Sequence, residues 1–265
     1  GNLEHAVLKK GLFESIELCF LLHGLRNKTF CLIGGQSIGI GTTIADPAQW
    51  QRIWGICSDH RDQLEVYMLA ENQDDKRVAI YRSWLETLGG IQFGNLFSEK
   101  SLDKQIRSYL TIKDMVKQGE YSFLALKCQQ ELSDWYALQC LSIALLNNPF
   151  DAEGSKQVVP CSCEGDCDGA LTMQILHSLD TSQPSCLVDI RSYDEANKEF
   201  LFANCGGMAL GYANPVDNID AKRKTIMMPH MFGKAGGGTT QFMTHRSEER
   251  RVGKECRSRW CAHHH

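Results

Sequence analysis

A short apolar run that leads into a glycine-rich loop constrains the fold of this chain most strongly. Residues 29–33 (TFCLI) are almost continuously apolar, as in a strand that is buried on both faces of a parallel sheet. Residues 3–25 before the run carry apolar side chains at helical spacing, and residues 34–42 after it contain four glycines. This helix–strand–glycine-loop order predicts a doubly wound α/β domain, in which ligands gather at the carboxyl ends of the strands.

The glycine-rich loop matches neither of two common nucleotide-binding signatures. A P-loop needs a Lys followed by Ser or Thr after its last glycine, and residues 34–42 contain no Lys. A dinucleotide-binding fingerprint needs a third glycine where this chain has Ile44. We therefore expect the glycines to let the backbone approach a small ligand or a neighbouring element closely.

Apolar periodicity predicts further elements in the first part of the chain. They are helical or mixed segments at 50–55 and 64–70, helices at 78–88, 101–118 and about 135–146, and a buried strand at 123–126. Ser101 suits the start of the 101–118 helix and Gly119 suits its end.

A polar, turn-rich segment at residues 147–157 (NNPFDAEGSKQ) predicts a domain boundary near residue 157. We expect residues 1–157 to form the doubly wound parallel-sheet domain. Residues 158–245 are then expected to form the truncated start of a second, more β-rich domain, with strand patterns at 185–190 and 199–205.

An acidic stretch opens this second part of the chain. Glu164, Asp166 and Asp168 fall within five residues of the sequence CEGDCDG, ahead of a helix-like run that reaches Leu179. Carboxylates beside glycine at a strand-to-helix junction are suited to hold a divalent ion with oxygen ligands. The alternative is that Asp166 or Asp168 only caps the helix.

A second acidic segment contains Glu131 and Asp134. Both acidic segments follow apolar runs and precede helices, so an α/β architecture would bring them to the same carboxyl edge of the sheet. Carboxylates around an open ion site could polarise a carbonyl group and shuttle a proton. The alternative is two unrelated helix N-termini whose acidic residues complement the helix dipoles.

The end of the chain does not look native. Residues 246–260 (RSEERRVGKECRSRW) match, at all fifteen positions, the peptide that one reading frame of a widely used sequencing-library adapter encodes. We interpret residues 246–265 as an adapter-derived, non-native tail and exclude them from function. Without the six Lys/Arg and three Glu of that tail, 22 basic residues face 29 acidic ones, a net charge of −7. This balance argues against binding to a nucleic-acid backbone.

Hydropathy and cysteine usage indicate a cytoplasmic protein without a membrane segment. No apolar run reaches the roughly 18 residues that a membrane-spanning helix needs, and the polar start GNLEH is unlike a secretory signal. The ten cysteines outside the tail, several of them in apolar patterns, indicate reduced thiols. A thiolate metal site of Cys161, Cys163 and Cys167 stays open as a third hypothesis, although its spacing matches neither a zinc ribbon nor a ferredoxin.

Three stretches resemble the L-fucose isomerase family, with the L-arabinose isomerases as relatives. They are residues 28–56, residues 106–148 and the sequence CEGDCDGALTMQIL at 163–176, and LVDIRSYDEANKEFLFANCGG continues the likeness. The resemblance implies that the chain covers the second domain and the first part of the C-terminal domain of such a protein. It also implies a sugar substrate and a homo-oligomer, which is a hexamer in the family.

The resemblance implies functional roles for three carboxylates. Asp166 matches the family's metal-binding Asp, and Glu164 matches the position of a metal-binding Glu in the arabinose isomerases. Glu131 is our candidate for the other acidic ligand and for the proton-transfer group, so that Glu131 and Asp166 would be the catalytic pair. Asp134 remains a rival, because residues 147–157 resemble an insertion that weakens the match. The implied metal is Mn²⁺ or another divalent cation, which agrees with oxygen ligands.

The implied activity is aldose–ketose isomerisation through a cis-enediol, with the ion holding O1 and O2 of the sugar and an acidic group moving a proton between C2 and C1. A non-catalytic sugar-binding or regulatory protein of the same fold is the alternative. The metal-binding His of the family lies beyond the matched region. A catalytic ion generally needs about three protein ligands, so we expect residues 1–265 alone to be inactive.

Overall fold

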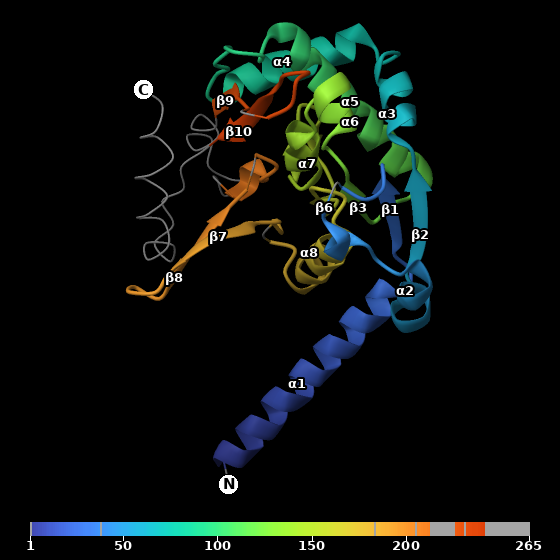
Figure 1. The fold of residues 1–265 in the computed structure, drawn as a ribbon. Coiled ribbons are helices and arrows are strands. Elements are labelled where there is room, and N and C mark those ends of the chain that lie inside the picture. The colour runs from blue at the N-terminus through green and yellow to red at the C-terminus, as the bar shows by residue number, and fades with distance from the viewer. Residues whose placement is uncertain are drawn as a thin grey trace.

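A four-stranded parallel sheet forms the centre of the molecule (Figure 1). The computed structural model describes residues 2–37, 39–182, 184–204, 206–212, 226–230 and 232–241. The strands are β1 (Thr29–Ile33), β2 (Cys57–Arg61), β3 (Phe123–Leu126) and β6 (Cys161–Ser162), and they lie in the order β2-β1-β3-β6. All three strand pairs are parallel, so the predicted α/β class is confirmed.

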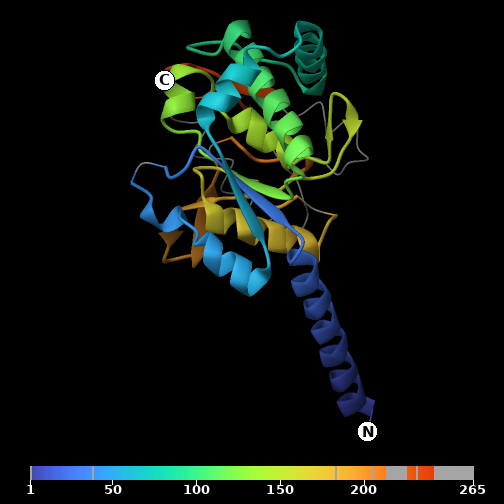
Figure 2. The same ribbon diagram turned by 90° about the vertical axis from the view of Figure 1, so that its right-hand side faces the viewer.

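Helices cover both faces of this sheet (Figure 2). The described helices of the chain are α1 (Asn2–Leu25), α2 (Pro47–Trp54), α3 (Gln63–Ala70), α4 (Asp75–Leu88), α5 (Glu99–Gly119), α6 (Glu131–Trp135), α7 (Cys140–Leu146) and α8 (Cys167–Leu179), with 3₁₀ turns at Gly41–Thr43 and Leu210–Tyr212. Cys31 and Ile33 of β1 belong to the apolar layer of α4, α5 and α7, whereas Phe30 belongs to the layer of α2 and α8. The run at 29–33 is apolar throughout because its alternate side chains enter two different layers.

Helix α1 confirms the helix expected at 3–25, but it projects away from the other elements (Figures 1 and 2). Its C-terminal residue Leu25 is fully buried. Large apolar side chains along the rest of the helix are exposed, namely Leu8, Leu12, Phe13, Ile16, Leu18, Phe20 and Leu22. A large exposed apolar surface on a helix is normally covered by other protein, so this surface is unusual for a free helix.

The ends of α5 differ from the prediction. The N-cap is Ser98, whose hydroxyl accepts from the Ser101 backbone, and the Ser101 hydroxyl in turn accepts from the Ser98 backbone. Gly119 is the last helical residue, and Glu120 takes the left-handed cap conformation with φ of 51°. A Cβ at Gly119 would lie 2.3 Å from the Tyr121 ring, so the glycine is explained by close packing.

The helix expected at about 135–146 is wrong in its extent. The chain forms α6 and α7 there, and the segment from Tyr136 to Gln139 between them is not helical but is buried. Every residue from 136 to 146 is buried, so the sequence gives no sign of the break between the two helices. Strand β2 was not predicted, because it lies at the sheet edge and its residues are mostly exposed.

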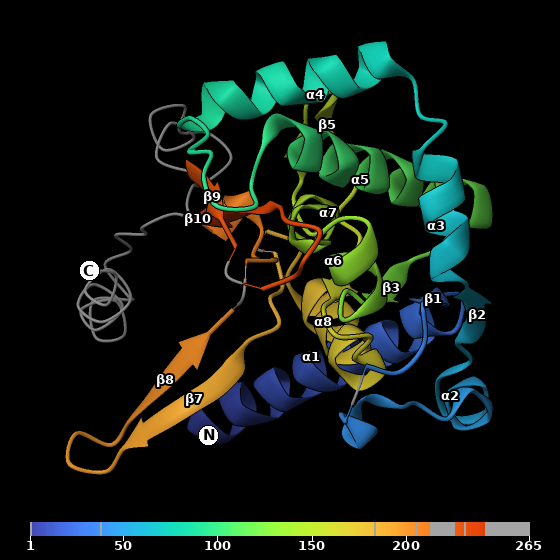
Figure 3. The same cartoon turned by 45° about the horizontal axis from the view of Figure 1, so that its top comes forward.

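Three small antiparallel pairs complete the described structure. They are β4 (Phe150–Asp151) with β5 (Gly154–Ser155), β7 (Asp189–Asp194) with β8 (Glu199–Ala203), and β9 (Ile226–Pro229) with β10 (Gly238–Gln241). The β7–β8 hairpin projects from the remaining elements (Figure 3). The expected β-rich character of the second part is confirmed, although β7 begins later than the strand expected at 185–190.

The domain division near residue 157 stays a prediction. Strand β6 and helix α8 follow this position and pack on the same sheet as β1 and β3. The expected non-native tail at 246–265 lies outside the described residues. Within the described ranges, no helix combines the length and apolar character needed to cross a membrane.

Candidate functional site

The strand order reverses between β1 and β3. From β1 the chain moves outward to β2, then crosses to the other side of β1 to form β3. Doubly wound sheets bind ligands at such a reversal of strand order. The loops that follow β1, β3 and β6 all leave the sheet at this edge, as the sequence predicted for the two acidic segments.

Lys127 and Glu131 form an ion pair directly after β3. The Lys127 Nζ lies 3.0 Å from Glu131 Oε1 and 2.9 Å from Oε2. The lysine side chain is only 9% exposed, whereas the glutamate side chain is 54% exposed. The hydrogen bond from Lys127 holds the pKa of the Glu131 carboxyl below its usual range. Glu131 is therefore an ionised carboxylate that solvent can reach.

Ser37 joins the loop after β1 to the acidic loop after β6. Its buried hydroxyl donates to Glu164 Oε2 at 3.1 Å and lies 3.5 Å from the carbonyl oxygen of Gln129 in the loop after β3. The Ser37 side chain, in the loop after β1, thus contacts the loops after β3 and β6. The sequence prediction that Glu164 and the Glu131 segment share one edge agrees with these contacts.

Gly165 explains why a glycine follows Glu164. Its φ is 65°, and a Cβ placed on it would lie 2.6 Å from the carbonyl oxygen of Gly35. The Gly165 N–H also donates to the Leu126 carbonyl oxygen at 3.2 Å. The acidic loop therefore packs backbone against backbone on the glycine-rich loop, which is the close approach expected of those glycines.

Asp166 occupies the N-cap position of α8. Its Oδ1 accepts from the Gly169 N–H at 2.8 Å, so the capping alternative describes this side chain in the structure. Asp168 lies in the first turn of α8, where burial and the charge of Asp166 raise the pKa of its carboxyl. Both aspartates therefore lie at the N-terminus of α8, where acidic side chains interact favourably with the helix dipole.

Asp134, the rival of Glu131, faces a different element. Its carboxylate lies 3.1 Å from Lys234 Nζ and accepts from the Lys234 N–H at 3.2 Å. The Ala235 N–H donates to the Ser133 carbonyl oxygen at 3.0 Å. Asp134 thus fixes the segment between β9 and β10 onto α6.

The predicted metal ligands do not form a metal site in this arrangement. Among the residues that the structure describes, no group of three or more His, Cys, Asp or Glu side chains is placed to hold a metal ion. Glu131 faces Lys127, Glu164 faces Ser37, and Asp166 faces the α8 backbone. Each predicted carboxylate therefore already has a protein partner.

The thiolate hypothesis gains no support from the geometry. Cys161, Cys163 and Cys167 are buried, and the thiols of Cys161 and Cys167 lie near backbone carbonyl oxygens. Burial raises the pKa of both these thiols.

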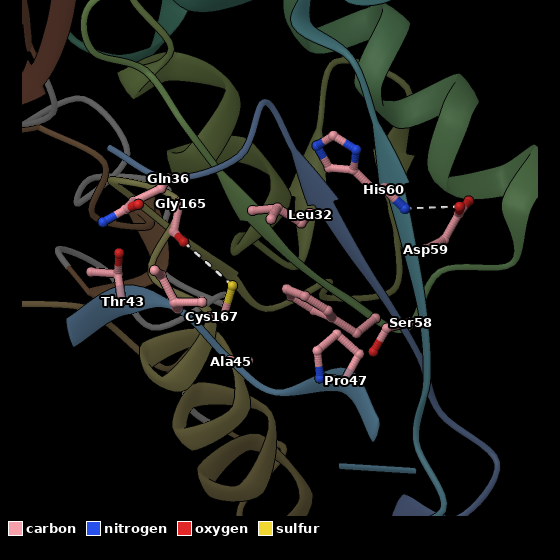
Figure 4. Close-up of a pocket in the computed structure, with 12 residues that line it drawn as sticks. Leu32, Gln36, Thr43, Ala45, Pro47, Ser58, Asp59, His60, Gly165 and Cys167 are labelled. Atoms are coloured by element: carbon pink, nitrogen blue, oxygen red, sulfur yellow. Dashed lines mark hydrogen bonds between the residues drawn. The ribbon is translucent and has the colours of Figure 1, made fainter. Parts of the chain in front are cut away.

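A cavity of about 400 Å³ adjoins the acidic loop (Figure 4). It lies on the α2–α8 face of β1 and β2, with Ser58 and His60 of β2, Gln36 of the glycine-rich loop, and Gly165 and Cys167 of the acidic segment among its lining residues. Phe30, Leu32, Ile44, Ala45 and Pro47 supply its apolar surface. Apolar walls with a few polar groups are typical of small-molecule sites.

Sequence reasoning missed Ser37, Lys127 and His60 at this edge. Ser37 lies inside the glycine-rich loop, and Lys127 follows β3 immediately, so position relative to the strands could have indicated both. His60 could not be placed because β2 was not predicted. Lys127 and Ser37 are the residues that connect Glu131 and Glu164 to their surroundings.

Comparison with known proteins shows distant similarity to sugar isomerases. The chain is 22% identical over 249 residues to the sulfoquinovose isomerases of Priestia aryabhattai and Priestia megaterium, covering 91% of this chain and 53% of each relative. It is 26% identical over 215 residues to the L-fucose isomerase of Bacteroides fragilis, covering 70% of this chain and 36% of that protein. No family model matches. The chain thus spans about half, or less, of the length of these relatives, and the predicted resemblance to the fucose isomerases is confirmed.

Proposed function

We propose that this chain is part of an aldose–ketose isomerase that acts on a free sugar. The observation that carries the proposal is the meeting of the Glu131 and Glu164 segments at the switch point of the sheet, with Ser37 touching both. The distant similarity to L-fucose and sulfoquinovose isomerases supports the reaction class. Neither relative's named sugar is thereby assigned to this chain.

Glu131 is the proposed proton-transfer group. It is ionised, more than half exposed, and held at the open edge of the sheet by an anchored lysine. A carboxylate in this state can accept the C2 proton of an aldose and return it to C1, and the proton of the O2 hydroxyl moves to O1, which forms the ketose through an enediol. Asp166 stays the proposed second catalytic carboxylate, and Glu164 a further acidic group of the site.

Mn²⁺ or another divalent cation stays the proposed cofactor, with Glu131, Glu164 and Asp166 as the proposed acidic ligands. The arrangement of the described residues does not itself fit an ion, because these carboxylates face protein donors. We therefore place the proton transfer at C2 and C1 on Glu131 and derive no step through a metal.

The cavity beside the acidic loop is the proposed place for part of the sugar. Gln36, Ser58 and His60 offer polar groups for sugar hydroxyls, and Phe30 and Leu32 offer an apolar surface for the ring. The exposed apolar side chains of α1 support the proposed homo-oligomer, and the nine free cysteines among the described residues support a reducing cytoplasmic location.

The test is an assay of the complete reading frame from which this chain derives. Purified protein with Mn²⁺ is incubated with L-fucose, L-arabinose and sulfoquinovose, and ketose formation is followed by chromatography. We expect ketose from at least one sugar, and loss of product by about 10²-fold or more in Glu131→Gln. Lys234→Met, which removes the partner of neighbouring Asp134, is the matched control and should retain activity. Absence of ketose from every sugar would defeat the proposal.

A non-catalytic sugar-binding protein is the second candidate function. The capping of α8 by Asp166 favours it, because a cap alone explains that residue without any chemistry. Sugar binding measured by calorimetry, with no ketose formed by the complete protein, would establish this candidate instead.

A further inference from the structure

The Lys127 side chain is held more firmly than an ordinary surface lysine. Its N–H donates to the Ile33 carbonyl oxygen at 3.0 Å, and its own carbonyl oxygen accepts from the Gln63 side-chain amide. A Cβ at Gly165 would lie 3.6 Å from the Lys127 Cβ, so the acidic loop packs against the lysine stem. Backbone and stem are therefore fixed by β1, α3 and the acidic loop.

The ammonium of Lys127 uses both oxygens of Glu131. The two Nζ–O distances are 3.0 and 2.9 Å, and the pair forms in a turn, since α6 begins only at Glu131. Lys234 offers a contrast, because its side chain is 82% exposed where it meets Asp134. The charge of Glu131 is thus neutralised by a nearly buried cation that belongs to the chain.

A divalent ion and this ammonium would compete for the two oxygens. Small divalent ions lie about 2.1 Å from a carboxylate oxygen, inside the shell that the ammonium occupies. Two cations at one carboxylate also repel each other strongly where one of them is nearly buried. The Lys127 ammonium therefore weighs against a metal ion at Glu131 in the described arrangement.

We propose that Lys127 is a positioning residue that occupies the cation position at Glu131, so that a divalent cation reaches this carboxylate only by displacing the lysine ammonium. The inference rests on the proposed function for the identity of Glu131 as the reacting carboxylate. It assigns to Lys127 a role that none of the sequence motifs indicated.

The first test measures displacement in the unaltered chain. Lysine amines are acetylated with a limiting reagent in the presence and absence of millimolar Mn²⁺, and the modified positions are quantified by mass spectrometry. We expect Mn²⁺ to raise the labelling of Lys127 severalfold and to leave that of Lys234 unchanged. Equal labelling of Lys127 with and without Mn²⁺ would overturn the inference.

The second test measures Mn²⁺ affinity by electron paramagnetic resonance of the free ion. Lys127→Met should bind Mn²⁺ about tenfold more tightly than the unaltered chain, because the competing charge is gone. Lys127→Arg keeps the charge and should not gain affinity, and Lys234→Met should stay within about twofold of the unaltered chain. Equal or weaker binding by Lys127→Met overturns the inference. If Lys127→Met fails to fold by circular dichroism, the labelling experiment decides alone.

These outcomes are distinguishable from failure of the proposed function. If the complete protein forms ketose but Mn²⁺ does not change the labelling of Lys127, only the proposed competition between Mn²⁺ and Lys127 for Glu131 is overturned. Displacement of Lys127 by Mn²⁺ without ketose from the complete protein overturns only the isomerase proposal.

Discussion

Ser37 and Glu164 are separated by 127 positions in the chain, yet the hydroxyl of Ser37 donates to the carboxylate of Glu164 at 3.1 Å. The serine is buried, and its hydroxyl also lies 3.5 Å from the Gln129 carbonyl oxygen. The hydrogen bond therefore connects loops that come from three parallel strands. It fixes the direction of one of the two acidic segments relative to the other.

Ser37→Ala should destabilise the chain by about 1–2 kcal/mol, because the partly buried carboxylate of Glu164 loses a donor. Urea unfolding monitored by circular dichroism measures the loss. Ser15→Ala is the matched control: its hydroxyl also donates to a carbonyl, but on the exposed surface of α1, and its effect should stay below about 0.5 kcal/mol. Equal effects of the two substitutions would contradict the role given to Ser37.

Asp166→Ala should lower stability by about 1 kcal/mol, because the N-cap of α8 is lost. Asp166→Asn should retain most of that stability, since asparagine caps helices nearly as well as aspartate. Comparing these two substitutions in the complete protein separates the capping role of Asp166 from a catalytic role. If Asp166→Asn keeps both the melting temperature and full ketose formation, Asp166 is a cap only.

Gly165→Ala should destabilise the chain by roughly 1–3 kcal/mol, because the residue has φ of 65° and its new Cβ would lie 2.6 Å from the Gly35 oxygen. Gly154→Ala is the control, since Gly154 also has positive φ, at 106°, but nothing lies within 4 Å of its Cβ position. The difference between the two melting temperatures isolates the contact between loops. A smaller loss for Gly165→Ala than for Gly154→Ala would refute this contact.

The buried carboxylate of Asp151 should make stability fall in acid. Burial alone raises the pKa of this carboxyl, but hydrogen bonds from Lys113, Tyr109 and the Glu153 N–H outweigh it and hold the pKa below its ordinary value. A lowered folded-state pKa means that the stabilisation is complete above the unfolded pKa of about 4. It is then lost as the pH falls through the folded pKa.

Urea midpoints between pH 6 and pH 3 measure this dependence, and Asp151→Asn should flatten it while costing about 3–5 kcal/mol at pH 6. Asp75→Asn is the control, because Asp75 pairs with Arg107 at an 87% exposed position and should change little. An unchanged acid slope in Asp151→Asn would assign the effect to other carboxyl groups.

Sequence patterns predicted those parts of the fold in which burial is uniform. Strands β1 and β3 were recognisable because both faces of each are covered, so their residues are apolar without interruption. The edge strand β2 presents Ser58, Asp59 and His60 on exposed positions and has no such signal. The break between α6 and α7 was hidden because the residues from Tyr136 to Gln139 are as buried as those of α7.

The candidate site was predictable in its place but not in its contacts. Carboxylates after β3 and β6 had to reach one edge of a parallel sheet, and that reasoning needs only strand direction. Whether Glu131 meets an ion or Lys127 depends on side-chain positions within a few ångströms. Sequence spacing cannot resolve such a choice, since Lys127 and Glu131 are four residues apart without lying on one helix.

The long helix α1 also matters for handling the protein at the bench. Its apolar side chains from Leu8 to Leu22 form an exposed surface, to which we expect hydrophobic dyes such as ANS to bind even when the sheet is folded correctly. Dye binding by this chain is therefore no sign of a misfolded sheet. A version that starts just before Leu25 keeps the buried end of the helix and removes the exposed apolar side chains. Such a version is the better sample for crystallisation.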